Sequence, residues 1–129
     1  MDCKDLMIND FVYVIRGYDK HLTIEKIKGV IADKDEPYPV TIFTGETVSL
    51  NDIEPIELTE DILVKNGFDK DERSKYFHVY TLNIKGSYDF DICWSSVNGF
   101  NYEGDFMLTY VHQLQHLLRL CGVEKELTI

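Results

Sequence analysis

The sequence predicts an α+β fold: a small SH3-like β-barrel, a short helix, a three-stranded antiparallel meander and a C-terminal helix. Three observations predict it. Short β-rich runs separated by turns fill the first half, apolar and polar residues alternate in the second half, and a helical apolar stripe lies near the end. The two predicted modules, 1–58 and 59–129, are expected to pack as one compact unit.

The barrel is predicted to contain four or five short strands. Turn signals at 16–19, 33–37 and 44–46 separate the apolar runs. A sheet made of such short strands buries enough apolar surface only when it curls on itself. Residues 51–58 leave the barrel, and Pro55, which lacks an N–H, is expected at a sheet edge. The predicted strands cover residues 11–15, 22–32, 38–43 and 47–50.

A short helix is expected to link the two modules. Thr59 suits its N-cap, and Gly67 suits the C′ position after the last turn. Glu60 and Asp61 place negative charge in the first turn, where the helix dipole favours it.

Residues 76–106 predict the meander, because side chains alternate between apolar and polar over 88–94. Three-residue turns are predicted at 85–87 and 97–99, since two-residue turns would pair aromatic with polar side chains. The resulting register pairs Ile84 with Tyr88, Leu82 with Phe90, Tyr80 with Ile92 and Tyr102 with Trp94.

The last helix is predicted over Thr109–Cys121, with Thr109 as its cap and Gly122 at C′. Its apolar stripe is expected to cover the aromatic face of the meander. The stripe consists of Val111, Leu114, Leu117, Leu118 and Cys121.

The chain carries 23 acidic and 13 basic residues, a net charge of −10. This charge disfavours direct binding to nucleic acids and to anionic membranes. No signal-peptide pattern or membrane-spanning run is visible, which predicts a cytoplasmic protein. Cys3, Cys93 and Cys121 are far apart and form no CxxC pair, so reduced, inert thiols are expected.

Two segments carry a resemblance to a known group of proteins. They are residues 52–63, closed by Lys65-Asn66-Gly67-Phe68, and the stretch Tyr110-Val111-His112-Gln113-Leu114-Gln115. With Ile8-Asn9-Asp10-Phe11-Val12, they resemble, in order along nearly the whole chain, a family of small uncharacterised Bacteroidetes proteins from prophage-like or mobile regions. The resemblance implies no catalytic or ligand-binding residue, and it implies asparagine more often at the position of His116.

His112 and His116 are the only candidate metal ligands, because their spacing lets two imidazoles on a helix share one ion. A helical wheel places both on the polar side, position 113 is Gln rather than the HExxH glutamate, and no third ligand can be named. A solvated or partner-facing surface is therefore expected here. The sequence predicts no metal and no other cofactor.

The other chemical candidates also favour structural roles. Asp89 and Asp91 share a strand face but imply no cleft or nucleophile, so they are expected on the wet side of the sheet. Cys93 is expected near Val79 and on the face opposite His78, away from a base. The charged segments 33–36 and 69–72 lack the Gly and Glu of a calcium loop and are expected to be turns. The sequence predicts no enzyme.

Surface contacts are the remaining functional feature. The candidate interaction surface contains Tyr18, Tyr38, His112, His116 and Leu120. The leading hypothesis is a non-catalytic interaction or accessory protein whose partner is another protein. The alternatives are an acidic mimic that blocks a nucleic-acid-binding host protein, and nucleic-acid binding through the barrel. A homodimer formed by pairing of edge strands is possible.

Overall fold

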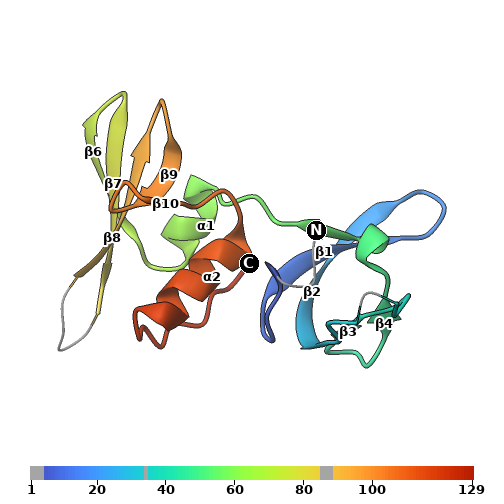
Figure 1. Cartoon of the computed structure of the whole chain (residues 1–129). Coiled ribbons are helices and arrows are strands. Elements are labelled where there is room, and N and C mark those ends of the chain that lie inside the picture. The colour runs from blue at the N-terminus through green and yellow to red at the C-terminus, as the bar shows by residue number, and fades with distance from the viewer. Residues whose placement is uncertain (1–4, 34, 85–88) are drawn as a thin grey trace. The chain divides into compact units, whose positions relative to one another are not determined.

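The computed structural model describes residues 5–33, 35–84 and 89–129, and it divides the chain into two compact units, residues 1–56 and 57–129 (Figure 1). The chain is α+β, mostly strands in two antiparallel sheets with two helices. Each unit contains one five-stranded sheet. None of the helices in the described part of the chain is long and apolar enough to cross a membrane.

The first sheet has the strand order β4-β3-β2-β1-β5. Its long strand β2 is irregular between Ile27 and Gly29, and this break lets one strand pair with β1 at one end and β3 at the other. No ladder joins β4 to β5 among the described residues, so the sheet is open. The elements are β1 (Phe11–Arg16), β2 (His21–Val30), β3 (Val40–Ile42), β4 (Thr47–Val48), the 3-10 helix η2 (Leu50–Asp52) and β5 (Ile53–Pro55).

The predicted strands of this unit are present, and the exit segment supplies the fifth. Pro55 lies on β5 at the edge of the sheet, opposite Val12, as its missing N–H requires. One face of the sheet is apolar and buried, because alternate residues of each strand point to the same side. The buried cluster contains Leu6, Val12, Val14, Ile27, Val40, Ile42, Val48 and Ile53.

The second sheet has the order β10-β9-β8-β7-β6, five strands rather than the three expected. Its extra strands are the two edges. Segment 69–72, expected to be a charged turn, lies in β6, where all six residues are exposed. A charged edge strand has no apolar alternation to reveal it, although its charges discourage pairing with other chains. The strands are β6 (Asp69–Ser74), β7 (Phe77–Asn83), β8 (Asp89–Ser95), β9 (Gly99–Tyr102) and β10 (Phe106–Met107).

The register of the central hairpin is confirmed where it is described: Leu82 pairs with Phe90, and Tyr80 pairs with Ile92. The turn at 85–87 and the partner of Ile84 lie outside the described residues. At the next hairpin Trp94 pairs with Phe100, so the predicted pairing of Trp94 with Tyr102 was wrong.

The loop of that hairpin is still three residues long, but it begins one residue earlier. Ser95 pairs with Gly99, whose positive φ of 68° suits the left-handed position at the end of such a loop. The slip moves the pairing by two residues, so the aromatic side chains stay on the buried face.

Helix α1 (Glu60–Lys65) forms as its cap residues predict. Thr59 Oγ1 accepts a hydrogen bond from the Ile62 amide at 3.3 Å, and Gly67 adopts a φ of 90° just after the helix.

Helix α2 (Val111–Leu120) begins two residues later than expected. The prediction that Thr109 caps this helix was wrong, because the side chain of Gln113 supplies the polar group that binds amides at the start of the helix. Its Oε1 accepts hydrogen bonds from the amides of Thr109 and Tyr110, at 2.8 and 2.9 Å. Gly122 follows the helix with a φ of 73°, as predicted.

Both helices lie on one face of the second sheet (Figure 1). The sheet contributes Tyr80, Leu82, Phe90 and Ile92 to the core, and the helices contribute Leu63, Leu114 and Leu118. The last helix therefore covers the aromatic face of the meander, as predicted. Additional buried residues come from the connecting and terminal segments: Leu58, Phe68, Leu108, Val123 and Leu127.

The C-terminal segment is tied to the end of α1 by Asn66. This side chain is only 3% exposed. Its Nδ2 donates to the carbonyl oxygens of Ile62 and Thr128, each at 2.8 Å, and its Oδ1 accepts from the Thr128 amide at 2.7 Å. One buried amide thus satisfies main-chain groups of Ile62 and of Thr128, which lies 62 residues after Asn66 in the sequence.

Candidate interaction surfaces

The second unit carries an apolar groove of about 240 Å³ between β10 and α2. Two residues of the predicted interaction surface, His116 and Leu120, line it together. Leu117 forms a buried floor, and the rim is exposed: Leu120 is 77% exposed, Phe106 53% and Met107 45%. The remaining lining residues are Leu108 and Gln113.

Hydrogen bonds fix both walls of this groove. The Leu108 amide donates to the carbonyl of Phe100 at 2.9 Å, which holds the end of β10 against β9. Gln113 fixes the start of α2 through its bonds to the Thr109 and Tyr110 amides. The groove is therefore a built feature of the fold, and its exposed rim does not arise from a loose segment.

A tight acidic turn leads into the β10 wall. The Asp105 amide donates to the carbonyl of Tyr102 at 3.3 Å, and the two residues between them have positive φ, 54° for Glu103 and 78° for Gly104. Glu103 and Gly104 are thus the two central residues of a tight turn, and the first of these positions favours asparagine or glycine over glutamate. Glu103 and Asp105 are both exposed.

His112 does not belong to this surface. It is only 5% exposed, so its predicted place on the polar side of the helix was wrong. Gln115 is buried as well, which means that α2 is enclosed over a wider arc than the single stripe assumed by a helical wheel. The His112 ring stacks on Tyr110 and meets His116 edge-on, with centroids 5.6 Å apart. Within the described residues no three His, Cys, Asp or Glu side chains are grouped to hold a metal.

The two tyrosines of the predicted surface lie in the first unit. Tyr18 is fully exposed at the turn between β1 and β2. Tyr38 lines a separate polar pocket of about 230 Å³ near the end of β1, together with Arg16, Glu46 and Asp52.

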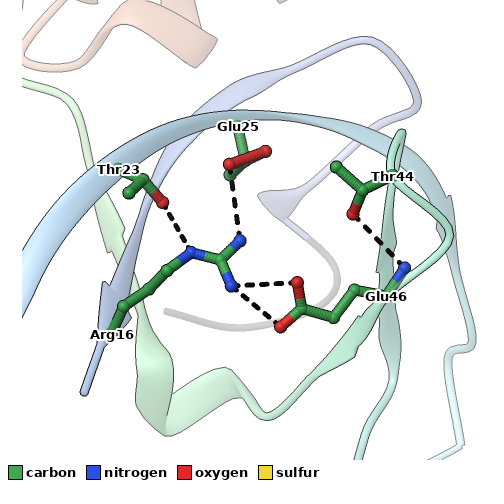
Figure 2. Close-up of polar contacts among 5 residues, drawn as sticks. All are labelled: Arg16, Thr23, Glu25, Thr44 and Glu46. Carbon is green, nitrogen blue, oxygen red and sulfur yellow. Dashed lines mark hydrogen bonds and ion pairs between the residues drawn. The ribbon is translucent and has the colours of Figure 1, made fainter.

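Arg16, which lines that pocket, is the centre of a network of polar contacts (Figure 2). Its Nη1 donates to both carboxylate oxygens of Glu46 at 2.9 Å, its Nε donates to Thr23 Oγ1 at 2.8 Å, and its Nη2 reaches Glu25 Oε1 at 3.4 Å. The hydrogen bond to Glu46 is the main cause of the raised pKa of Arg16. The cation is already matched by two carboxylates, so this network acts as a clamp that joins the β3–β4 turn to β1 and β2.

The sheet of the second unit carries another ionic group where α1 meets β6. Lys70 Nζ lies 2.7 Å from Glu60 Oε1, and this hydrogen bond lowers the pKa of Glu60. Burial, and next the charge of Glu60, raise the pKa of Tyr80. His78 lies on the same face, stacked on Trp94, with its Nε2 3.4 Å from Glu72.

The Glu60–Lys70 pair predicts an acid-dependent loss of stability. The folded pKa of Glu60 lies below its ordinary value of 4.5, so its contribution is complete above pH 4.5 and disappears as the pH falls through the lower folded pKa. The Glu60→Gln variant should therefore be less stable than the wild type at neutral pH, and the difference should vanish in acid. Urea unfolding followed by fluorescence of Trp94, the only tryptophan, checks this. A difference that grows in acid would contradict it.

The opposite face of the second sheet is polar and solvated. Asp89 and Asp91 are exposed there, and they accept hydrogen bonds from Asn83 Nδ2 at 3.1 Å and from Thr81 Oγ1 at 2.7 Å. Cys93 lies beside Val79 on this face, as predicted. Burial, and to a lesser degree Asp91, raise the pKa of the Cys93 thiol. Less thiolate at neutral pH suits the inert role expected for this cysteine.

Sequence reasoning missed the β10 side of the groove rim and the Arg16 clamp. Phe106 and Met107 stand in a two-residue strand, which is too short for any periodic signal. Arg16 comes directly before Gly17 and looks like part of a turn, while its partner Glu46 is 30 residues away. Comparisons with protein-family models, curated proteins and solved structures find no match for this chain.

Proposed function

We propose that this chain is a non-catalytic interaction protein that binds another protein through the groove between β10 and α2. The observation that carries the proposal is the exposed apolar rim of Phe106, Met107 and Leu120 around the buried Leu117. Bulky apolar side chains gathered around a hollow are typical of protein-binding surfaces, because water leaves them when a partner docks. The resemblance to proteins from mobile regions agrees with an accessory role and remains a prediction.

The fold of the first unit is part of the proposal. We propose that it belongs to the SH3-like barrels. The bulged strand β2 pairs with both β1 and β3, and η2 precedes the edge strand β5, which supports a strongly curved small sheet.

Leu120→Glu tests the binding surface. A tagged chain should capture one stoichiometric partner from its native host, and the variant should lose at least about tenfold of that capture, because a buried charge without a partner is costly. Val97→Glu is the matched control: Val97 is 87% exposed in the same unit and lies in the β8–β9 loop. A partner captured equally by all three proteins would overturn the proposal.

A second candidate function, the acidic mimic of nucleic acid, has one observation in its favour. Asp69, Asp71, Asp89 and Asp91 project from a single face of the second sheet, because Thr81 pairs with both Asp69 and Asp91. The test is the quadruple variant in which all four of these aspartates are replaced by asparagine. It should lose a salt-sensitive, nucleic-acid-binding partner that Leu120→Glu retains.

A further inference from the structure

The size of the groove limits what can occupy it. At about 240 Å³ it is smaller than the cavities that enclose a drug-sized ligand, and its floor and rim are apolar. One or two bulky side chains of a partner fill such a volume. Because β10 is an edge strand, a partner segment in extended conformation can run alongside it while these side chains enter the groove.

The charges beside the groove indicate what flanks those side chains. Glu103 and Asp105 are exposed in the turn that leads into Phe106. None of the ion pairs among the described residues involves either carboxylate. Glu103 also occupies a left-handed position at which asparagine or glycine would be less strained. Two exposed carboxylates thus lie in the turn that precedes Phe106, the first residue of the groove wall in β10.

We infer that the groove binds a short protein segment whose bulky apolar side chains are flanked by lysine or arginine. This inference rests on the proposed function and adds the chemistry of the partner. The flanking cations would lie against Glu103 and Asp105 and favour association with a chain of net charge −10. A second copy of this chain is the weaker candidate, because it would bring the same negative charge to the interface.

Three blocked pentapeptides test the inference by amide chemical shifts of the full-length, ¹⁵N-labelled chain. They are lysine–leucine–lysine–leucine–lysine, the same peptide with serine in place of leucine, and the same peptide with glutamate in place of lysine. The first should shift the amides of 106–108 and 113–120 saturably. It should bind about threefold or more tighter than the other two, because only it combines both features.

Charge variants localise the effect. The double variant Glu103→Gln/Asp105→Asn should bind the first peptide about threefold or more weakly than the wild type, since it removes two rim charges. The double variant Asp61→Asn/Glu124→Gln removes the same charge from exposed positions that do not line the groove, and it should bind as the wild type does. Equal weakening by both double variants would overturn the inference.

The peptide outcomes separate this inference from the proposed function. Equal binding of the glutamate peptide, equal shifts with the serine peptide, or no shifts in the groove would each overturn the basic-apolar assignment. None of these results bears on the capture of a native partner, which Leu120→Glu and Val97→Glu test independently. If the peptides overturn the inference but a partner is still captured in a Leu120-dependent way, the groove is a docking site for a segment of different chemistry.

Discussion

Replacing Asn66 by alanine is expected to lower the free energy of unfolding of residues 57–129 by about 2–4 kcal/mol. The buried side chain makes three hydrogen bonds, and two of them hold the main chain of Thr128. Alanine leaves the Ile62 and Thr128 groups without this partner, and it releases the segment that places Leu127 in the core. Urea unfolding followed by Trp94 fluorescence measures the loss within this unit.

Two further variants separate this role from simple packing. Asn66→Asp keeps the shape and the acceptor, but it replaces the donor that faces two carbonyl oxygens, so it should also destabilise the unit. Thr128→Ala should change stability by less than about 0.5 kcal/mol, because Asn66 binds the main chain of Thr128 and not its hydroxyl. An Asn66→Ala protein as stable as Thr128→Ala would refute the tie.

Asn66 also makes a long-range contact that local sequence signals do not predict. Local signals were sufficient for α1, since Thr59 marks its start by a side-chain hydroxyl that caps the helix and Gly67 marks its end by a positive φ. The same signals place Asn66 beside the last turn of that helix. They contain nothing about a bond to a residue 62 positions later, because such a contact depends on how the C-terminal segment packs.

Strands were predicted where one face is buried and missed where neither is. The alternation that marks β8 comes from Phe90 and Ile92, which face the core. Strand β6 has only exposed residues, so the sequence pattern over Asp69–Ser74 is that of a charged turn, even though five of its six residues pair with β7. An alternating pattern indicates that one face of a strand is buried, and an exposed edge strand such as β6 has no buried face to produce the pattern.

The candidate site was predicted in part for a related reason. The helical stripe placed Leu120 outside the core, and this residue is exposed on the groove rim. The same wheel placed His112 in solvent, and it is buried. A wheel assigns one buried face from apolar residues alone, whereas neighbouring elements also enclose polar side chains that find partners. The opposite wall of the groove, β10, comes from a segment without a periodic pattern.

Arg16→Met is expected to lower the stability of the first unit by about 1.5–3 kcal/mol. Methionine keeps most of the apolar stem, but it removes the guanidinium that bridges Thr23, Glu25 and Glu46. Glu25 then loses its counter-charge on a side chain only 20% exposed, which makes the loss larger than that of a surface ion pair. Hydrogen exchange of the β1 and β2 amides measures the change where it occurs.

A double-mutant cycle distinguishes the clamp from general destabilisation. Arg16→Met and Glu46→Gln each break the same paired contact, so the double variant should lose less stability than the sum of the two, by about 0.5–1.5 kcal/mol. Arg16→Lys keeps the charge but lacks the two-armed geometry that reaches three partners, and it should recover only part of the loss. Additive losses, or full recovery by lysine, would mean that Arg16 contributes charge alone. Because Glu46 belongs to the β3–β4 turn and Arg16 to β1, a measured coupling would identify this bridge as what holds the turn against the long hairpin.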